Sequence, residues 1–260
     1  MKTLCVVSMS GGLDSTTLAF RALSELENCD ILPININYGQ KNIVEMKAFK
    51  NIIDYMQNDS LYKNNIMDPI ILDVNQFMKP VISQWQKQRD SGSIKDITEM
   101  EFYTPSRNLF FTAIASMIGE IIALNNYDEI KIGIGIHKHE TYSRNYWDIT
   151  PQFAKTFDAL LSLNDCANIE IYSPYVNKFK SDIVADAIRM SVPWELTWTC
   201  YNPIVTELKD IEPDANSHPF KVSPCNKCEA CIERKNAGAK QGFPEINDYV
   251  IYLKEEDMNV

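Results

Sequence analysis

The chain has 260 residues, of which 45% are hydrophobic and 23% charged, and its formal net charge is −10 at pH 7. This composition is typical of one globular domain with an appendage, and it excludes disordered and collagen-like chains. The acidic balance disfavours nucleic acid as the main ligand, and the lack of a long apolar run or a signal-peptide pattern predicts a cytoplasmic protein with no membrane segment.

Strand and helix patterns alternate along residues 1–192. Short apolar runs that end at turn residues predict strands over 3–8, 31–38, 69–74, 129–136 and 168–172. Apolar residues at helical spacing predict helices over 15–27, 42–56, 107–124, 151–163 and 181–190. This alternation favours the α/β class, with a doubly wound parallel sheet covered on both faces.

Other segments add detail to this pattern. Residues 75–104 are polar and predict irregular structure with short helices, and residues 137–150 predict a loop. The helix over 107–124 is apolar almost all round, so we expect it to be buried. The alternation ends at Pro193. We therefore divide the chain into an α/β domain, residues 1–192, and a Cys-rich C-terminal region packed on it, residues 193–260.

The turn between the first strand and the first helix carries an anion-binding pattern. Two glycines let the backbone approach an anion, successive N–H groups form a nest, and the helix N-terminus faces the same point. Serine hydroxyls add donors, and an aspartate can hold Mg²⁺ beside the phosphates. We expect ATP to be bound by Ser10, Gly11, Gly12, Leu13, Asp14 and Ser15. The loop lacks the lysine of GxxxxGK[ST], and it resembles the SGGxDS loop of PP-loop ATPases, which split ATP between the α- and β-phosphates.

Cysteines near the C-terminal end predict a metal site. Cys225, Cys228 and Cys231 lie in one short polar segment, and Cys200 can supply a fourth thiolate. Four thiolates are typical of structural Zn²⁺, but they also suit an iron–sulfur cluster. The spacing favours zinc without deciding between the two.

Together, the loop and the cysteines resemble the 7-cyano-7-deazaguanine synthase family, QueC. Further landmarks follow in the family's order over residues 4–243. They are Tyr38-Gly39-Gln40, Tyr103-Thr104-Pro105-Ser106-Arg107-Asn108, Lys180-Ser181-Asp182-Ile183-Val184, Thr199-Cys200-Tyr201 and Arg234.

The resemblance implies a PP-loop ATPase fold with ATP, Mg²⁺ and Zn²⁺, a homodimer, and a place in queuosine biosynthesis. The implied enzyme is an ATP-dependent, AMP-forming ligase that adenylates 7-carboxy-7-deazaguanine. Ammonia then gives the amide, and a second activation and elimination give the nitrile. Adenylation makes chemical sense because AMP is a far better leaving group than the oxygen of a carboxylate.

The family pattern also suggests roles for single residues. Asp14, Arg107 and Lys180 are candidate catalytic residues, because Arg107 can hold phosphate or carboxylate and Lys180 can meet charge on the α-phosphate. Tyr38 and Gly39 join the ATP-binding residues. Candidate substrate-binding residues are Arg107, Tyr146 and Asp148, whose carboxylate can accept from the N–H groups of a guanine-like edge. His137 and His139 lie in a loop that looks unlike the family, but they follow the end of a strand and are candidate general bases.

One segment departs from the family pattern. Ile149-Thr150 stands where the family carries a Cys-Arg pair near the deazapurine. This departure suggests a second hypothesis, in which the activated carboxylate is joined to another amine, such as a protein N-terminus, in antiviral defence. Two further hypotheses are a tRNA thiolase of the same ATPase class and a degenerate member that binds only a nucleotide or a partner protein.

Overall fold

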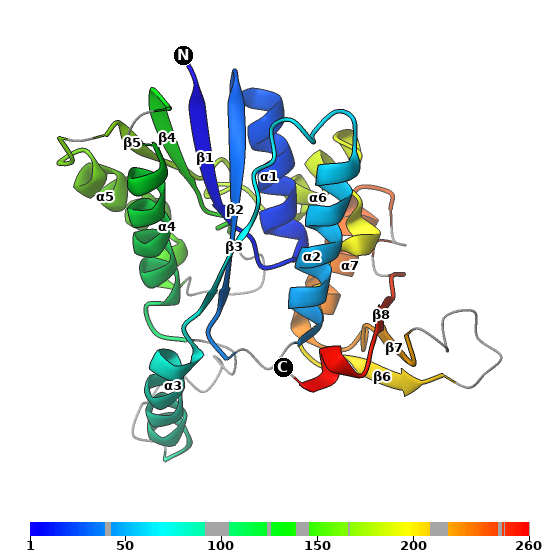
Figure 1. The fold of residues 1–260 in the computed structure, drawn as a ribbon. Helices are drawn as coiled ribbons and strands as arrows, with labels where there is room; N and C mark the ends of the chain where they lie inside the picture. Colours follow the sequence, from blue (N-terminus) through cyan, green and yellow to red (C-terminus); the bar gives the residue numbers. More distant parts are fainter. Residues whose placement is uncertain are drawn as a thin grey trace.

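A computed structural model describes residues 1–39, 43–91, 104–123, 126–138, 146–165, 167–208, 218–243, 246 and 248–259. Its centre is a five-stranded parallel sheet in the order β3-β2-β1-β4-β5 (Figure 1). The strands are β1 Thr3–Ser8, β2 Cys29–Asn37, β3 Ile70–Asp73, β4 Glu129–Gly133 and β5 Ile169–Tyr172. Because the chain proceeds from β1 to β3 on one side and then returns to β4, the switch point lies between β1 and β4, where such sheets bind ligands.

Helices cover both faces of this sheet, which confirms the doubly wound arrangement (Figure 1). One face carries α1 Leu13–Glu25, α2 Ile43–Asn58 and α6 Lys180–Arg189, and the other carries α4 Arg107–Ala123 and α5 Pro151–Leu161. Alternate residues of β1 serve the two faces: Cys5 and Val7 pack in the α1 core, and Leu4 and Val6 pack in the α4 core. All four side chains are fully buried, as expected of a central parallel strand.

Two sequence expectations about helices are wrong. Residues 75–90 form one long helix, α3 Asn75–Asp90, instead of irregular structure. Its many Gln and Lys residues have good helix propensity, and the helix accommodates Pro80. Helix α4 is not buried all round, because Met117 and Ile121 are 56% and 63% exposed. The sheet covers only the side that carries Ala115 and Ile118.

The C-terminal region contains more regular structure than the sequence pattern indicated. Strands β6 Ile204–Glu207, β7 Phe220–Ser223 and β8 Ile251–Leu253 form an antiparallel sheet. Helix α7 Glu229–Lys240 begins after Cys228, contains Cys231 and packs along α6. The region has its own small core, which α2 joins through Val44 and Ala48. The strands are too short for their apolar alternation to be recognised.

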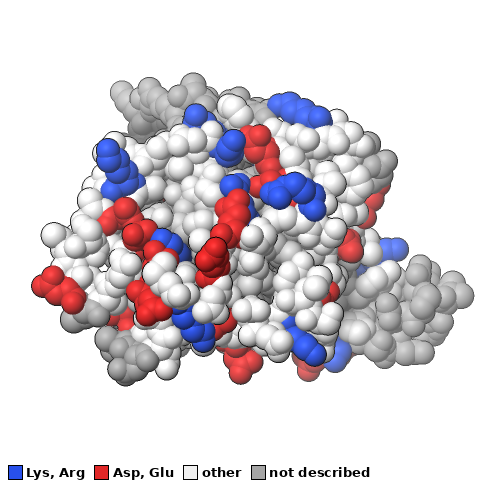
Figure 2. Space-filling model, turned by 90° about the horizontal axis from the view of Figure 1, so that it is seen from above, with Lys and Arg blue, Asp and Glu red and all other residues white. Residues whose placement is uncertain are grey.

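Charges are mixed over the surface that Figure 2 shows. Lys and Arg side chains lie among Asp and Glu side chains on this face, without a continuous basic area in the described part. None of the helices described is long and apolar enough to cross a membrane.

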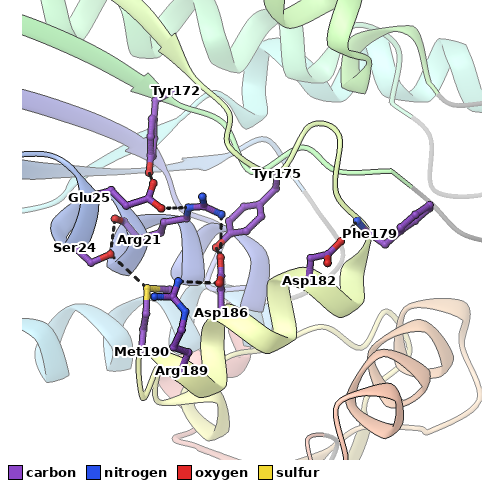
Figure 3. A network of polar contacts seen from close by, with 10 residues as sticks. All are labelled: Arg21, Ser24, Glu25, Tyr172, Tyr175, Phe179, Asp182, Asp186, Arg189 and Met190. Carbon is purple, nitrogen blue, oxygen red and sulfur yellow. Dashed lines mark hydrogen bonds and ion pairs between the residues drawn. The ribbon is translucent and has the colours of Figure 1, made fainter.

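Hydrogen bonds and ion pairs join α1 to α6 (Figure 3). Asp186 accepts hydrogen bonds from Arg21 Nη1 at 2.9 Å, from Tyr175 Oη at 2.9 Å and from Arg189 Nη2 at 2.8 Å. The Arg21 guanidinium also lies 5.0 Å from the centroid of the Tyr175 ring and donates to Glu25. This network matters for the site, because α1 begins at the glycine loop and α6 begins at Lys180.

We expect Asp186→Asn to lower the free energy of unfolding by about 1–3 kcal/mol at pH 7, because it removes the charged acceptor of these bonds. Burial raises the pKa of Asp186, but the bonds from Arg189, Tyr175 and Arg21 outweigh burial and lower it. The contribution is therefore present above about pH 4, the unfolded pKa, and is lost as the pH falls through the lower folded pKa. Urea unfolding at several pH values should show that the difference in unfolding free energy between the variant and the parent protein becomes smaller in acid. Asp68→Asn, at an exposed position, is the matched control.

Candidate functional site

A pocket of about 290 Å³ opens at the carboxyl ends of the central strands. It lies at the switch point between β1 and β4, and helices α1, α2 and α4 also contribute to it. The lining residues are Ser8, Met9, Ser10, Gly12, Asp14, Ser15, Ile34, Asn35, Ile36, Tyr38, Glu45, Arg107, Asn108, Phe111, Thr112, Ile134, Gly135, Ile136 and Tyr201. Apolar strand ends therefore form one wall, and charged and hydroxyl groups form the rim.

The predicted glycine loop forms the floor of this pocket. Gly12 is the N-cap of α1, so the helix N-terminus faces the pocket. The Ser15 hydroxyl accepts from the Ser10 N–H at 3.2 Å, and the Ser10 hydroxyl accepts from the Gly12 N–H at 3.1 Å. Such an arrangement of donors can hold an oxyanion. Leu13 differs from the other predicted residues, because its side chain is buried in the core and does not line the pocket.

Gly11 has no room for a side chain. Its φ is +86°, and a Cβ there would lie 2.4 Å from Glu45 O and 2.6 Å from Phe49 N, both backbone atoms of α2. We expect Gly11→Ala to lower the unfolding free energy by at least about 2 kcal/mol and to abolish measurable ATP binding, because α2 or the loop must move.

The matched control for Gly11→Ala is Gly242→Ala. Gly242 also has a positive φ, +72°, but nothing lies within 4 Å of its added Cβ. Urea unfolding and calorimetric titration with Mg-ATP should separate the two variants. Unchanged ATP affinity in Gly11→Ala would contradict the role of the loop.

Asp14, Lys180 and His137 meet beside the loop. Lys180 Nζ forms an ion pair with Asp14 Oδ1, and His137 Nε2 lies 3.5 Å from Asp14 Oδ2. Lys180 is 3% exposed and His137 is 7% exposed. Burial raises the pKa of the Asp14 carboxyl, but Lys180 and His137 outweigh burial and hold that pKa well below its usual range. The carboxylate is therefore ionised at neutral pH, with one buried cation directly bound to it.

His137 is held from both sides. Its Nδ1 lies 2.9 Å from the Lys138 carbonyl oxygen, while Nε2 faces Asp14. Burial lowers the pKa of His137, and the Asp14 carboxylate more than offsets this, so the pKa is raised. A ring with acceptors at both nitrogens favours the protonated form, which makes it a poor general base. The second candidate base, His139, lies outside the described residues, as do Gln40 and Tyr103.

Arg107 marks the other end of the pocket. Its Nη1 donates to the Tyr38 hydroxyl at 3.4 Å. Burial lowers the pKa of Arg107, but Tyr38, followed by Tyr201 and Glu45, outweighs burial and raises it. A guanidinium here can hold a carboxylate or a phosphate. Gly39, with φ +83°, lies beyond Tyr38 and outside the pocket lining.

The other two predicted substrate residues lie behind the pocket wall. Asp148 is 1% exposed, and its Oδ2 accepts from the Asn108 N–H at 3.0 Å, which caps the start of α4. Tyr146 packs in the core between α5 and the end of β4. Neither lines the pocket of the described chain, so direct contact with substrate stays a prediction for both.

The departure at Ile149-Thr150 has a local structural effect. Ile149 is 9% exposed and joins the core with Phe153. Thr150 is the N-cap of α5, and its hydroxyl accepts from the Phe153 N–H at 3.1 Å. This threonine therefore completes a helix end, and no guanidinium is available at its position to hold an anion.

The four predicted cysteines come together. Their Sγ atoms all lie within 4.8 Å of one another, and Cys228 Sγ is 4.0 Å from Cys200 Sγ. Thiolates bound to one zinc ion at about 2.3 Å would lie about 3.8 Å apart, so the four groups fit a mononuclear site. Backbone N–H groups of Lys227 and Cys228 donate to Cys225 Sγ at 3.4 and 3.3 Å, as outer partners that orient a metal ligand commonly do.

Sequence reasoning missed several pocket residues, Glu45 and Tyr201 among them, and the arrangement of the ion pair. Glu45 was hidden in the helical pattern of α2, and Tyr201 resembled a packing residue beside the cysteines. Asp14 and Lys180 were each predicted, but their pairing links segments 166 residues apart. The one available signal was that each residue lies at the N-terminus of a helix, and that both helices pack on the same parallel sheet.

Comparisons with known proteins agree with one another. The model of the family described as "Queuosine biosynthesis protein QueC" matches residues 4–242. The 7-cyano-7-deazaguanine synthase of Nautilia profundicola is 31% identical over 94% of this chain and 97% of its own length. The protein of the same name from Rickettsia bellii is 26% identical over 95% of this chain and 98% of its own length.

Likeness to solved structures is more distant. A 4-thiouridine synthetase–RNA complex with bound ATP aligns with a TM-score of 0.41 and 16% identity, covering 96% of this chain and 55% of that chain. That likeness is too low to support a conclusion about function.

Proposed function

The chain belongs to the QueC family, and from this premise we propose that it activates 7-carboxy-7-deazaguanine with ATP and joins the activated carboxyl to ammonia. The amide oxygen then attacks the α-phosphorus of a second ATP and displaces pyrophosphate, and loss of AMP with that oxygen and of the two protons on nitrogen gives 7-cyano-7-deazaguanine. The observation that carries the proposal is the ionised Asp14, bound to the buried Lys180 beside the glycine loop at the N-terminus of α1.

Each activation needs the same groups. A carboxylate oxygen attacks the α-phosphorus, the bond to the β-phosphate breaks, and pyrophosphate leaves. Ser10, Gly11, Gly12 and Ser15 would stabilise the charge that gathers on the leaving pyrophosphate. Lys180 would meet the charge on the α-phosphate, and Arg107 would orient the substrate carboxylate. Ammonia then attacks the acyl carbon and AMP departs with the former carboxylate oxygen.

The chain offers residues for both expected metals. Asp14 would hold Mg²⁺, which supplies charge neutralisation at the phosphates. Cys200, Cys225, Cys228 and Cys231 would hold Zn²⁺ as a structural ion, because the site is closed by four thiolates. We propose that the chain has two parts: the ATP-binding domain, residues 1–192, and a C-terminal region with the four cysteines, residues 193–260, which packs on that domain.

The proposal is tested by mass spectrometry of a reaction with Mg-ATP and 7-carboxy-7-deazaguanine, with and without ammonium. We expect AMP and the nitrile when ammonium is present. If no AMP forms from this acid, the proposal is wrong.

The Ile149-Thr150 departure favours a second candidate, in which another amine captures the same adenylate. Thr150 caps α5 and carries no guanidinium, so this position offers no group to hold an anionic carboxylate. In the same reaction, AMP without nitrile would favour this candidate, and intact-mass analysis of added proteins would then show the conjugate. A protein N-terminus, with a role in antiviral defence, is the acceptor to examine first.

A tRNA thiolase is less well supported. The close spacing of the four Sγ atoms suits one metal ion, whereas the thiolates of an iron–sulfur cluster bind different irons and stand farther apart. Metal analysis should give zinc and a colourless protein. Iron and a brown colour would reverse this preference.

A further inference from the structure

The C-terminal region contacts the anion-binding loop directly. The Trp198 N–H donates to the Gly11 carbonyl oxygen at 2.9 Å, across 187 residues of sequence. We propose that Trp198 is a positioning residue through which the cysteine cluster, when it holds its metal, keeps the loop in its anion-binding form. The inference goes beyond the proposed function, because it holds for any carboxylate substrate.

The first step is the orientation of one peptide group. In the trans peptide between Gly11 and Gly12, the C=O and the N–H point in opposite directions. Because Trp198 holds the C=O on one side, the Gly12 N–H must point to the other side, where it meets Ser10 Oγ at 3.1 Å at the pocket rim. Two adjacent glycines allow this peptide to turn over at little steric cost, so an external bond is needed to select one orientation.

The second step is the connection from Trp198 to the cluster. The indole Nε1 donates to the Cys200 carbonyl oxygen at 2.8 Å, and Trp198 is 1% exposed. Its ring packs edge-on against Tyr249, with the ring centroids 5.2 Å apart, in the core that also contains Cys200 and Cys231. Trp198 is thus fixed by the same residues that surround the cysteines.

A buried arginine supports the segment on either side of Trp198. Arg234, on α7, is fully buried and donates to Thr199 Oγ1 and to the Trp194 carbonyl oxygen, each at 2.9 Å. Helix α7 begins directly after Cys228, and Cys231 lies in its first turn. Binding of a metal by the cysteines therefore fixes α7, Arg234 and the Trp198 segment together, since so small a core is expected to depend on its metal.

The consequence is a thermodynamic coupling between two sites. If the metal stabilises the loop form that binds phosphates, it must raise nucleotide affinity, and the nucleotide must raise metal affinity by the same factor. We expect this factor to be about tenfold, near the lower end of common coupling energies.

The experiment uses the full chain, zinc-loaded and metal-free, titrated with Mg²⁺ and α,β-methylene-ATP, which cannot be split at the α,β position. We expect the Kd for the nucleotide to be about tenfold weaker without zinc. Trp198→Phe keeps the backbone N–H but loses the indole bond to Cys200. In this variant, the Kd values of the zinc-loaded and the metal-free protein should therefore differ by less than about threefold. Trp147→Phe, at a half-exposed site outside the C-terminal region, should keep the full difference. Far-UV circular dichroism reports whether the metal-free protein keeps its helices.

If the metal-free protein unfolds, the reciprocal measurement replaces the titration. Zinc affinity is measured by competition with a chelator, with and without the nucleotide analogue. We expect the analogue to raise zinc affinity about tenfold in the parent protein and much less in Trp198→Phe. Equal zinc affinities with and without the analogue, or an equal effect in both proteins, would overturn the proposal.

Discussion

Replacing Asp14 by asparagine should lower kcat for AMP formation by about 10³-fold, the upper range for loss of one preorganised electrostatic group. The substitution keeps the size of the side chain but removes the charge that faces Lys180 and His137. It also removes the oxygen ligand that we expect to hold Mg²⁺ beside the phosphates. The rate of AMP release, followed by chromatography at saturating ATP and substrate, measures the effect.

The control for this prediction must remove a carboxylate without touching the pocket. Asp68→Asn does so at an exposed position whose Oδ1 accepts from Gln57. We expect that variant to keep its full activity. Retention of more than a tenth of the parent rate by Asp14→Asn would show that the carboxylate has no central role.

Lys180→Met should reduce the rate of AMP formation by about 10²-fold, because it removes the cation that we propose to meet the charge on the α-phosphate. Lys180 is the first residue of α6, where the helix dipole disfavours a positive charge. Its burial at that unfavourable place is compensated by Asp14. Loss of one partner from a buried ion pair typically costs about 3–5 kcal/mol, and the 27% exposure of Asp14 places this case at the lower end.

The double variant Asp14→Asn with Lys180→Met separates stability from catalysis. Removing both charges should restore much of the unfolding free energy, because neither charge is left unpaired. Activity should stay at the level of the weaker single variant. Urea unfolding and AMP assays on the three variants check both statements, and recovery of activity in the double variant would exclude a direct role for the pair.

The organisation of the parallel sheet could be predicted because each strand is a short apolar run bounded by turn residues. The glycine loop could also be predicted from the sequence, because Gly11 and Gly12 lie between a buried strand and an amphipathic helix. The exposed side of α4 could not be predicted from the sequence. An apolar helix pattern shows which residues can be buried, but tertiary packing decides which side is covered. The three short strands of the C-terminal region depend on pairing over long separations, which local patterns do not report.

For the candidate site, too, the features that depend on residues close in sequence could be predicted, and those that depend on long-range contacts could not. The cysteines could be assigned because three of the four thiol groups are close in sequence and share one chemistry. The Asp14–Lys180 pair could not be assigned, because each residue has its own plausible partner in the ligand. Asp148 has a structural role that the sequence did not indicate, because its Oδ2 accepts from the Asn108 N–H at the start of α4; its contact with substrate stays a prediction.

The proposed function requires the chain to form an adenylate from a deazaguanine carboxylate. Isotope transfer tests it most directly, with 7-carboxy-7-deazaguanine labelled with ¹⁸O in both carboxylate oxygens. If the carboxylate attacks the α-phosphorus, AMP must leave with one labelled oxygen and be two mass units heavier. We predict this heavier AMP in the presence of ammonium. Unlabelled AMP, or no AMP, would contradict the account.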